Sequence, residues 1–398
     1  MATYKKQNKL NVPHLRFPEF HGEWEKCKLG DIAEFSTARI SSVKLDCKNY
    51  VSTENMLQDF QGVVEAKSVP NETNVISFTC GDILISNIRP YLKKVWKATF
   101  DGGCSSDVFV LQATDTVAKD YLHYAVANDK FINYVMSGAK GVKMPRGDKN
   151  QMRTYQLSLP SIQEQYKIAK LLTLLDERIA TQSKLIEKLE SLIKGLNDFL
   201  YTQYGDEVLT SFAELGTSYS GLSGKSAQDF GSGKPFITYL NVYSNNVIKE
   251  NDFQYVAIKD DEKQNVVKYG DVLFTLSSET PEEVGVGSVY LGKEKVYLNS
   301  FCFGIHITNT EVAFPPYLSY YVSLTAFRKF IYPYAQGSTR FNLCKADFEK
   351  ASIKLPTLAD QKRIYSVLGH IDCKIETERQ MLNLYNSQKQ YLLRQMFI

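Results

Sequence analysis

The sequence predicts an α+β protein in which two repeated mixed α/β domains are joined by two long helices that form an antiparallel coiled coil. Three observations support this fold class: an internal repeat, strand-type runs in each half, and a long hydrophobic heptad pattern after each set of strands. The repeat divides the chain into five segments. They are an N-terminal arm (1–22), a first domain (23–158), a first helix (159–204), a second domain (205–354) and a second helix (355–398).

Four short segments occur in the same order in both halves of the chain. Leu159–Gln165 matches Leu355–Gln361, Leu171–Asp176 matches Val367–Asp372 and Tyr121–Tyr124 matches Tyr317–Tyr320, all at an offset of 196 residues, and Gly81–Ser86 matches Gly270–Thr275 at 189. Offsets that agree near the helices and drift elsewhere indicate a shared scaffold with divergent loops.

Each repeat contains strand-type runs bounded by Gly, Asp and Asn. Examples are the runs at 108–111 and 303–307, which are rich in Val, Ile and Phe. Short helical patterns follow at about Tyr121–Met136 and Tyr317–Ile331. Each domain is therefore expected to combine a sheet with a small helical layer.

Two long helices are predicted from their start signals and their periodicity. Each follows a proline and a near capping box, Ser161 with Glu164 and Thr357 with Asp360. A strict alternation of four- and three-residue steps then begins. The first seam is Ile168, Leu172, Leu175, Ile179, Gln182, Ile186, Leu189, Ile193, Leu196 and Leu200, and the second is Ile364, Leu368, Ile371, Ile375, Glu378, Leu382, Tyr385, Lys389, Leu392 and Met396.

A mean spacing of 3.5 residues indicates a coiled-coil seam, and the shared register makes each helix the natural partner of the other. The domain between the helices allows an antiparallel return. The alternative is that each helix packs only on its own domain, although a globular core favours a wider apolar stripe. Gln182 and Glu378 occupy the same seam position and either fix the register or are tolerated there.

Composition limits the class of protein. Lys and Arg number 47 and Asp and Glu 44, so any basic surface must be local. Seven scattered cysteines without a C-x-x-C pair suggest reduced thiols. No signal peptide and no apolar stretch of membrane length are recognisable, so we expect a cytoplasmic protein without membrane contact.

Candidate catalytic motifs are weak. The segment Gly221–Ser226 resembles a phosphate loop, but the first glycine would fall at Tyr219 and no helix pattern follows. Glu65-Ala66-Lys67 has a nuclease-like shape without a suitably spaced upstream acid. Cys302 and His306 lack further metal ligands, and an N-P-P-Y-like tetrapeptide for adenine methylation is absent. The sequence argues against a self-contained enzyme.

Two basic clusters lie in the first repeat. The segment 138–154 is glycine-rich and reads as an exposed loop with five basic residues and one acid, and the segment 87–97 adds four basic residues and two aromatic ones. Phosphate neutralisation requires such clusters, and base reading requires polar and arginine side chains on loops. The alternative is a solvated surface. The second repeat has corresponding loops at 219–225 and 336–340, where the repeats differ most.

The sequence resembles the specificity subunit of type I restriction–modification systems. The resemblance rests on Val12–Phe20 followed by Trp24 and Leu29–Ile32, on the G-D-I/V-L strands, and on the L-P-x-x-x-x-Q helix starts. It covers nearly the whole chain. It implies two target recognition domains that each read half of a split sequence in double-stranded DNA, with the two helices as an antiparallel spacer.

The resemblance also implies partners and recognition loops. Two modification (methyltransferase) subunits would dock on the helices and domains and bind S-adenosylmethionine, and restriction subunits would supply ATP and Mg chemistry. No cofactor is expected in this chain. The loops that carry over contain Arg39, Ser41, Ser42, Arg89, Tyr91, Lys93, Lys94, Lys97, Lys140, Lys143, Arg146 and Lys149 in the first domain, and Ser220, Ser223, Lys225, Ser277, Ser338, Thr339, Arg340 and Asn342 in the second.

One departure stands out: residues 277–283 are acidic where the first repeat is basic. The leading interpretation is a non-catalytic adaptor that reads DNA. The alternatives are a single chain that itself modifies or cleaves DNA, and a coiled-coil scaffold without DNA binding. A rod of thirty-three residues would be about 50 Å long, enough to address DNA segments about one helical turn apart.

Overall fold

The computed structural model describes residues 11–205 and 207–398. Two compact units make up the chain, one formed by residues up to Ser183 together with Gln380–Ile398, the other by Lys184–Arg379. Both long helices contribute one part to each unit. Across the described residues, no helix combines the length and the apolarity needed to cross a membrane.

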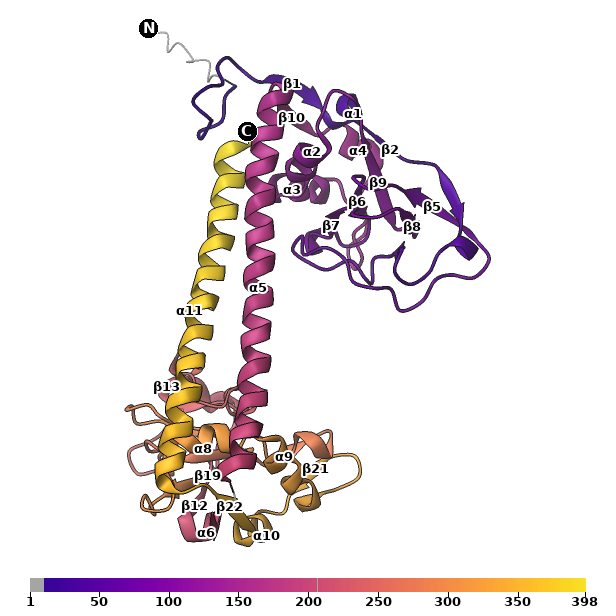
Figure 1. Ribbon diagram of the computed structural model, residues 1–398. Coiled ribbons are helices and arrows are strands. Elements are labelled where there is room, and N and C mark those ends of the chain that lie inside the picture. The colour runs from indigo at the N-terminus through magenta and orange to yellow at the C-terminus, as the bar shows by residue number, and fades with distance from the viewer. Residues whose placement is uncertain (1–10, 206) are drawn as a thin grey trace. The chain divides into compact units, whose positions relative to one another are not determined.

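The first unit contains two four-stranded sheets and one short strand pair (Figure 1). The sheet beside the helices has the order β2 (Ala33–Phe35), β9 (Val108–Ala113), β6 (Ile83–Ser86) and β7 (Val95–Lys97); the other sheet has the order β3 (Arg39–Ser41), β5 (Asn74–Phe78), β8 (Gly102–Cys104) and β4 (Tyr50–Val51); β1 (Glu25–Lys28) pairs with β10 (Gln156–Leu159). The helices are α1 (Leu29–Ile32), α2 (Lys119–Val126), α3 (Asp129–Ser137) and α4 (Lys149–Arg153), with 3₁₀ turns at Ser42–Lys44 and Pro90–Leu92.

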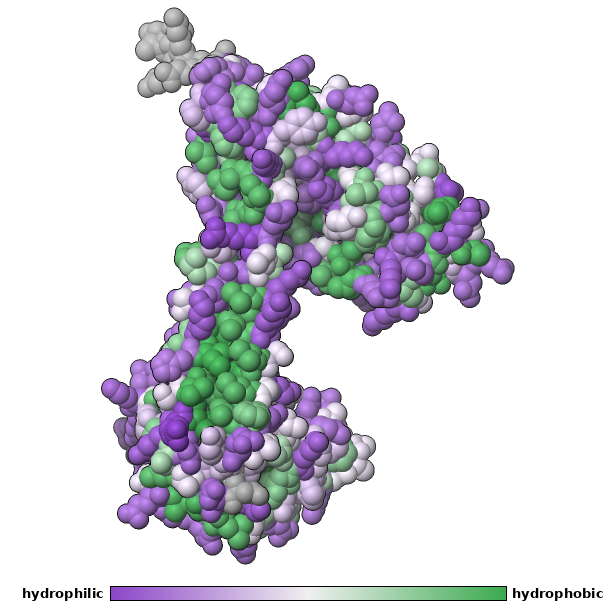
Figure 2. Space-filling view, viewed as in Figure 1, coloured by the Kyte–Doolittle hydropathy of each residue, from purple (hydrophilic) through white to green (hydrophobic). Residues whose placement is uncertain are grey.

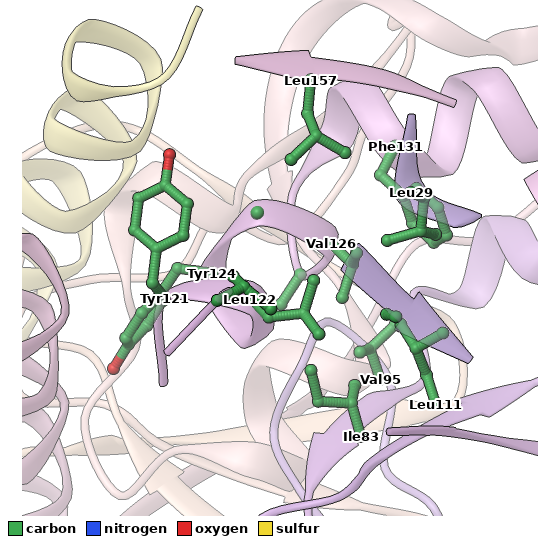
Figure 3. Packing of buried hydrophobic residues seen from close by; sticks show 14 of the residues in the cluster. Leu29, Ile83, Val95, Leu111, Tyr121, Leu122, Tyr124, Val126, Phe131 and Leu157 are labelled. Carbon is green, nitrogen blue, oxygen red and sulfur yellow. The ribbon is translucent and has the colours of Figure 1, made fainter. Parts of the chain in front are cut away.

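The core of the first unit lies between the β2-β9-β6-β7 sheet and the helices α2 and α3. Every residue of β6 is buried, as expected for a continuous apolar run. Its Ile83 joins Leu122 and Val126 of α2 and Phe131 of α3 in one cluster (Figure 3). The helical pattern expected at 121–136 is thus two helices, which are separated at Ala127 and Asn128.

The second unit repeats this plan with different additions. Its sheets are β12 (Gly216–Ser220), β19 (Cys302–Ile307), β15 (Val272–Thr275) and β17 (Gly287–Val289); β14 (Gln254–Val256), β13 (Phe230–Ile237) and β18 (Tyr297–Leu298); β16 (Ser277–Ser278), β21 (Phe341–Leu343) and β20 (Ala335–Gln336); and the pair β11 (Val208–Ser211) with β22 (Ser352–Leu355). The helices are α6 (Phe212–Leu215), α7 (Tyr239–Ser244), α8 (Pro315–Tyr321), α9 (Thr325–Ile331) and α10 (Lys345–Lys350), with 3₁₀ turns at Ala227–Asp229, Glu250–Asp252, Pro281–Glu283 and Tyr332–Tyr334.

The repeated Gly-Asp motif forms the same turn in both units. Gly81 and Gly270 have φ values of 90° and 87°, a left-handed conformation that favours glycine. The carboxylate of Asp82 then accepts the Thr79 amide at 2.9 Å, and that of Asp271 accepts the Lys268 amide at 2.8 Å. The motif therefore recurs because it turns the chain into a buried strand, β6 or β15.

The long helices are α5 (Ile162–Tyr204) and α11 (Leu358–Met396) (Figure 1). All twenty predicted seam positions are buried or half-buried. In the first unit Leu172 of α5 shares a core with Leu392 and Met396 of α11. In the second unit Leu368 of α11 shares a core with Leu196 of α5. The start of each helix thus packs against the end of the other, which confirms the antiparallel coiled coil.

Each helix start also packs into the core of its own domain. The side chain of Gln165 accepts the Ala118 amide at 2.8 Å and donates to the Pro160 carbonyl at 2.9 Å. Gln361 makes the same two bonds in the second unit, with the Phe314 amide and the Pro356 carbonyl. The glutamine of the L-P-x-x-x-x-Q motif therefore fixes the helix to its domain. Packing on the domain and pairing between helices coexist.

The helix caps differ from the predicted boxes. The Glu164 amide donates to Ser161 Oγ at 3.4 Å, but the Glu164 carboxylate binds the guanidinium of Arg16 through two contacts of 2.8 Å. In the second helix the Asp360 carboxylate accepts from the Thr357 hydroxyl at 2.8 Å. The N-terminal end of α5 is thus tied, through Glu164 and Arg16, to the arm that precedes the first domain.

Candidate nucleic-acid interface

Two of the predicted loops of the first unit are joined by backbone hydrogen bonds. One follows β6 and the other follows α3. The Arg89 amide donates to the Pro145 carbonyl at 2.8 Å and the Gly147 amide donates to the Asn87 carbonyl at 3.0 Å, with an antiparallel bridge between Ile88 and Arg146. We call residues 87–93 and 138–148 loop pair 1. These loops begin at residues 87 and 138 of the sequence, and the fold brings them together.

Loop pair 1 exposes a basic surface. Its exposed side chains include the cations Arg89, Lys140, Lys143 and Arg146, together with Tyr91, Val142 and Met144. Arg146 contacts Asp107 at 3.1 Å and Lys140 contacts Asp148 at 3.6 Å, both at the surface. Surface ion pairs of this kind contribute little stability, so these cations can exchange their partners for phosphates.

Arg89 and Lys93 have positive φ values of 50° and 54°, which are uncommon for residues with a side chain. They flank the 3₁₀ turn Pro90–Leu92 and give this loop its sharp shape. Such backbone conformations persist only where the surroundings hold them. The turn presents Tyr91 and Arg89 outward, as a recognition loop requires.

Four other predicted contacts of the first domain are engaged inside the protein. Lys93 binds Asp129 at 2.8 Å, and Lys97 is paired with Asp120. Lys94 donates to the Thr53 carbonyl at 2.6 Å, and burial lowers its pKa. Lys149 was expected in an exposed loop, but it begins α4 and is half-buried over the ring of Phe109 at 4.7 Å, where burial lowers its pKa. These four lysines therefore have partners within the first unit.

The segment Arg39–Ser42 belongs to the β3-β5-β8-β4 sheet rather than to loop pair 1. Ser42 is buried and its hydroxyl accepts the Thr73 amide at 3.0 Å, a structural bond. Ser41 is half-buried. Arg39 is exposed and donates to the Asn74 carbonyl at 3.0 Å. Of this segment, Arg39 alone presents a charge to solvent.

The equivalent loops also meet in the second unit. Strand β16 follows β15 and pairs with β21, so that Ser277 faces Asn342 and Ser278 faces Phe341. The tip of the hairpin between β20 and β21 exposes Ser338, Thr339 and Arg340. We call residues 277–285 and 335–342 loop pair 2. Ser277 itself is buried within the strand pair, and Asn342 is exposed.

Loop pair 2 borders an open pocket of about 710 Å³, and sequence reasoning missed three of its aromatic residues. They are Tyr239 and Tyr243 of α7, whose rings stack at 5.9 Å, and Phe301. The guanidinium of Arg340 lies over the Phe301 ring at 5.8 Å. The four-residue spacing of the two tyrosines was the available signal, but α7 has no counterpart in the first repeat.

The pocket is also acidic. Glu279 and Glu283 line it beside Ser277, Ser278, Thr339 and Arg340. Glu283 accepts the Tyr243 hydroxyl at 2.8 Å and the Ser278 hydroxyl at 2.9 Å, and these bonds hold its pKa below the usual value. Part of the acidic segment 277–283, whose counterpart in the first repeat is basic, therefore lines the pocket.

Three other predicted contacts of the second domain support its structure. The Lys225 side chain is 7% exposed, and its ammonium binds the Ala257 carbonyl at 2.6 Å and the Glu262 carboxylate at 2.5 Å. The backbone of Ser223 is bound by the Gln264 side chain on both sides. Ser220 is exposed, and its carbonyl accepts from Asn265. The lysine that a phosphate loop would need in this segment is instead paired with Glu262.

The candidate catalytic and metal-binding residues do not come together in a catalytic centre. Within the described part of the chain, no group of three His, Cys, Asp or Glu side chains could hold a metal ion. Cys302 is buried, which raises the pKa of its thiol, and His306 Nδ1 contacts Asp271 at 2.8 Å. The seven cysteines form no disulfide. Cys302 is thus a core residue, and His306 is a half-buried partner of Asp271.

Comparison with known proteins identifies the domains. The model of the type I restriction modification DNA specificity domain matches twice, at residues 21–191 and 216–384. The chain belongs to this family. The resemblance on which the sequence interpretation rested is therefore confirmed, and with it the interpretation of the chain as a DNA-specificity protein.

Relatives and solved structures agree with this assignment. The MjaVIII specificity subunit of Methanocaldococcus jannaschii is 27% identical over 51% of this chain and 47% of its own length, so the match spans about half of that relative. The putative MjaX specificity subunit of the same organism is 28% identical over 95% of this chain and 93% of its own. The crystal structure of a type I S subunit from M. genitalium has a TM-score of 0.57 at 13% identity, covering 97% of this chain and 99% of that one. It supports the fold.

Proposed function

We propose that this specificity protein reads a bipartite target in double-stranded DNA, with loop pair 1 contacting one half and loop pair 2 the other. One observation carries the proposal: both units join the loop after the central strand to the loop after the short helices, through the Ile88–Arg146 bridge and the Ser277–Asn342 pair. The two scaffolds are alike and the exposed side chains differ. Two readers of different half-sites require that combination.

The geometry narrows the proposed contacts. In the first domain, residues 23–158, they are Arg39, Arg89, Tyr91, Lys140, Lys143 and Arg146, and in the second, residues 205–354, they are Ser338, Thr339, Arg340 and Asn342. These side chains are exposed on loops or strand ends. Lys93, Lys97 and Lys225 are left out because their side chains are only 33%, 28% and 7% exposed, against 54% for Arg146 and 84% for Lys140.

The long helices offer a docking surface for modification subunits. In the second unit, Leu185, Leu192 and Phe199 of α5 follow one another at seven-residue intervals and are 39%, 54% and 58% exposed. In the first unit, Met381, Leu384 and Tyr391 of α11 are exposed as well. Figure 2 shows apolar side chains gathered on the face of these helices that is turned to the viewer. A monomer rarely leaves such a stripe uncovered.

We propose that two methyltransferase subunits cover this stripe and supply S-adenosylmethionine, and that restriction subunits supply ATP-driven cleavage with Mg. The chain itself would contribute recognition and spacing. Replacing Leu192 by Asp places a charge in the middle of the stripe and should abolish co-purification of the methyltransferase subunits. The matched control is Leu209→Asp, a leucine on β11 that is 68% exposed, which should leave assembly intact.

The decisive experiment is methylome sequencing of a host that carries this chain with its methyltransferase subunits. We expect methylated adenines in one bipartite motif that disappears when the chain is omitted. Methylation that persists without the chain would refute the proposal. Turnover of DNA by the purified chain alone, with Mg²⁺ and S-adenosylmethionine, would instead favour a single-chain enzyme.

A second experiment addresses the spacing. Removing one heptad at facing positions of α5 and α11 keeps the seam in phase and shortens each helix by about 10 Å, or roughly three base pairs. The same half-sites should then be methylated with a gap shortened by that amount. An unchanged gap would show that the helices do not determine the spacing.

A further inference from the structure

We propose that loop pair 2 reads a C·G base pair, with Glu279 accepting a hydrogen bond from the cytosine N4 amino group and Arg340 donating to guanine O6 and N7. The proposal rests on the proposed function and adds the chemistry of the base that the second domain selects. It explains why a DNA-facing pocket contains carboxylates, a feature that the sequence interpretation left unexplained.

A carboxylate at a DNA interface is repelled by the phosphates and offers no donor to the backbone. It is compensated only where it accepts a hydrogen bond from a base amino group, and glutamate with cytosine N4 is the characteristic pairing in the major groove. Arginine supplies the complementary pairing with guanine through its planar fork. One pocket that presents both groups is therefore suited to both bases of one pair.

Glu279 is the acidic residue of this loop that remains available for such a contact. Both carboxylate oxygens of Glu283 are occupied, one by Tyr243 and one by Ser278. Glu282 does not line the pocket. Glu279 lines it, is exposed, and forms no hydrogen bond or ion pair with any residue that the structure describes.

The loop that carries Glu279 is held in place. The guanidinium of Arg328 donates to three of its carbonyls, those of Gly285 at 2.6 Å, Glu282 at 2.7 Å and Val284 at 2.8 Å. Val284 is fully buried, and Ser278 is paired with β21. A loop anchored at both ends loses little entropy on binding, so Glu279 can discriminate between bases.

Arg340 faces the same pocket from the opposite loop. Its guanidinium lies over Phe301 and makes no ion pair among the described residues. The aromatic contact orients the planar group and leaves its N–H donors open. Because β16 and β21 are hydrogen-bonded to each other, the two loops that present Glu279 and Arg340 are fixed in one frame.

The test uses the full complex of this chain with its methyltransferase subunits and methylome sequencing of four versions: unchanged, Glu279→Gln, Arg340→Ala and the matched control Glu282→Gln. The unchanged motif should contain a C·G pair in the second half-site. Glu279→Gln and Arg340→Ala should each relax the choice at that same base pair by roughly 5- to 150-fold, as expected for loss of one good base contact. Glu282→Gln should change nothing.

Affinity for non-target DNA provides a second readout that a purely structural role would not produce. Glu279→Gln should bind such DNA more tightly, because a negative charge is removed, while Arg340→Ala should bind it more weakly. Relaxation at two different base pairs, a second half-site without a C·G pair, or an unchanged motif in Glu279→Gln would each overturn the inference. Bipartite methylation in those cases would leave the proposed function standing, and its absence in the unchanged complex would refute that function instead.

Discussion

The hydroxyl of Tyr124 donates a hydrogen bond of 2.8 Å to the carboxylate of Asp176, and so links the helical layer of the first domain to α5. Tyr320 makes the same bond to Asp372 of α11 in the second unit. Both pairs are 52 residues apart. Burial is the main cause that raises the pKa of each tyrosine, so each hydroxyl stays protonated and remains a donor. This shared bond explains why Tyr and Asp recur at one offset.

Removing the hydroxyl should destabilise the two units unequally. Tyr320→Phe should lower the unfolding free energy of the second unit by about 1.5–3 kcal/mol, as for other hydrogen bonds to charged groups. Tyr124→Phe should cost less, because Asp176 also binds Lys389 at 2.6 Å. Urea unfolding measures both. The control is Tyr134→Phe, whose exposed hydroxyl contacts Thr154, and three equal losses would contradict the argument.

The buried side-chain amide of Gln165 should contribute more to the stability of the first unit than the neighbouring side chains of α5 do. Gln165→Leu leaves the Ala118 amide and the Pro160 carbonyl without their partner, at about 1–3 kcal/mol for each buried group. We therefore expect a loss of about 3 kcal/mol or more in urea unfolding of the first unit. Gln163→Leu, an exposed position one half-turn earlier on the same helix, is the control. A similar loss for both would mean that the motif glutamine has no special role.

The fold was largely predictable because its signals are local. Heptad spacing, the Gly-Asp turn and the L-P-x-x-x-x-Q start each depend on residues within one or two turns of one another, and the repeat showed each signal twice. The helical break at Asn128 was missed, although its side chain caps α3 by accepting the Phe131 amide. That asparagine was an available start signal within a continuous helical pattern.

The candidate site was less predictable because charge alone does not show which cations are available. Lys93 forms an ion pair with Asp129. Lys225 forms one with Glu262, which lies 37 residues further along the chain. Both partners lie in segments that the sequence gave no reason to connect. The pocket beside Arg340 depends in the same way on Phe301 and on α7, which lie outside the repeated segments. Only the fold distinguishes a lysine with a partner inside its own domain from one that is exposed.

The salt dependence of DNA binding can separate exposed basic residues from those that are paired and partly buried within a domain. Arg146→Ala should weaken binding of the assembled complex and reduce the slope of log K against log salt by about 1, as expected for one lost phosphate contact. Lys97→Ala is the matched control, because its side chain is paired with Asp120 and only 28% exposed, against 54% for Arg146, and it should leave the slope unchanged. The same change in slope for both variants would show that the internal pairs open on binding.

The stability of the first unit should also depend on His123. Its Nδ1 is buried without a hydrogen-bond partner, and burial, assisted by the charges of Lys389 and Lys97, lowers its pKa to about 4. The ordinary value is about 6.5, so the folded state binds fewer protons than the unfolded state between these values. The stabilisation is therefore complete above about pH 6.5 and is lost as the pH falls towards about 4, by on the order of 3 kcal/mol.

His123→Phe should remove this part of the pH dependence. The equivalent residue of the second unit is Ser319, so the position does not require a ring nitrogen. The measurement is the urea midpoint of the unchanged protein and of the variant between about pH 7 and about pH 4.5. The difference between the two midpoints should be smallest near pH 7 and should grow as the pH falls, because the variant is less sensitive to acid. Parallel pH profiles would show that protonation of His123 does not set the acid sensitivity of the first unit, and would exclude His123 as the group that titrates.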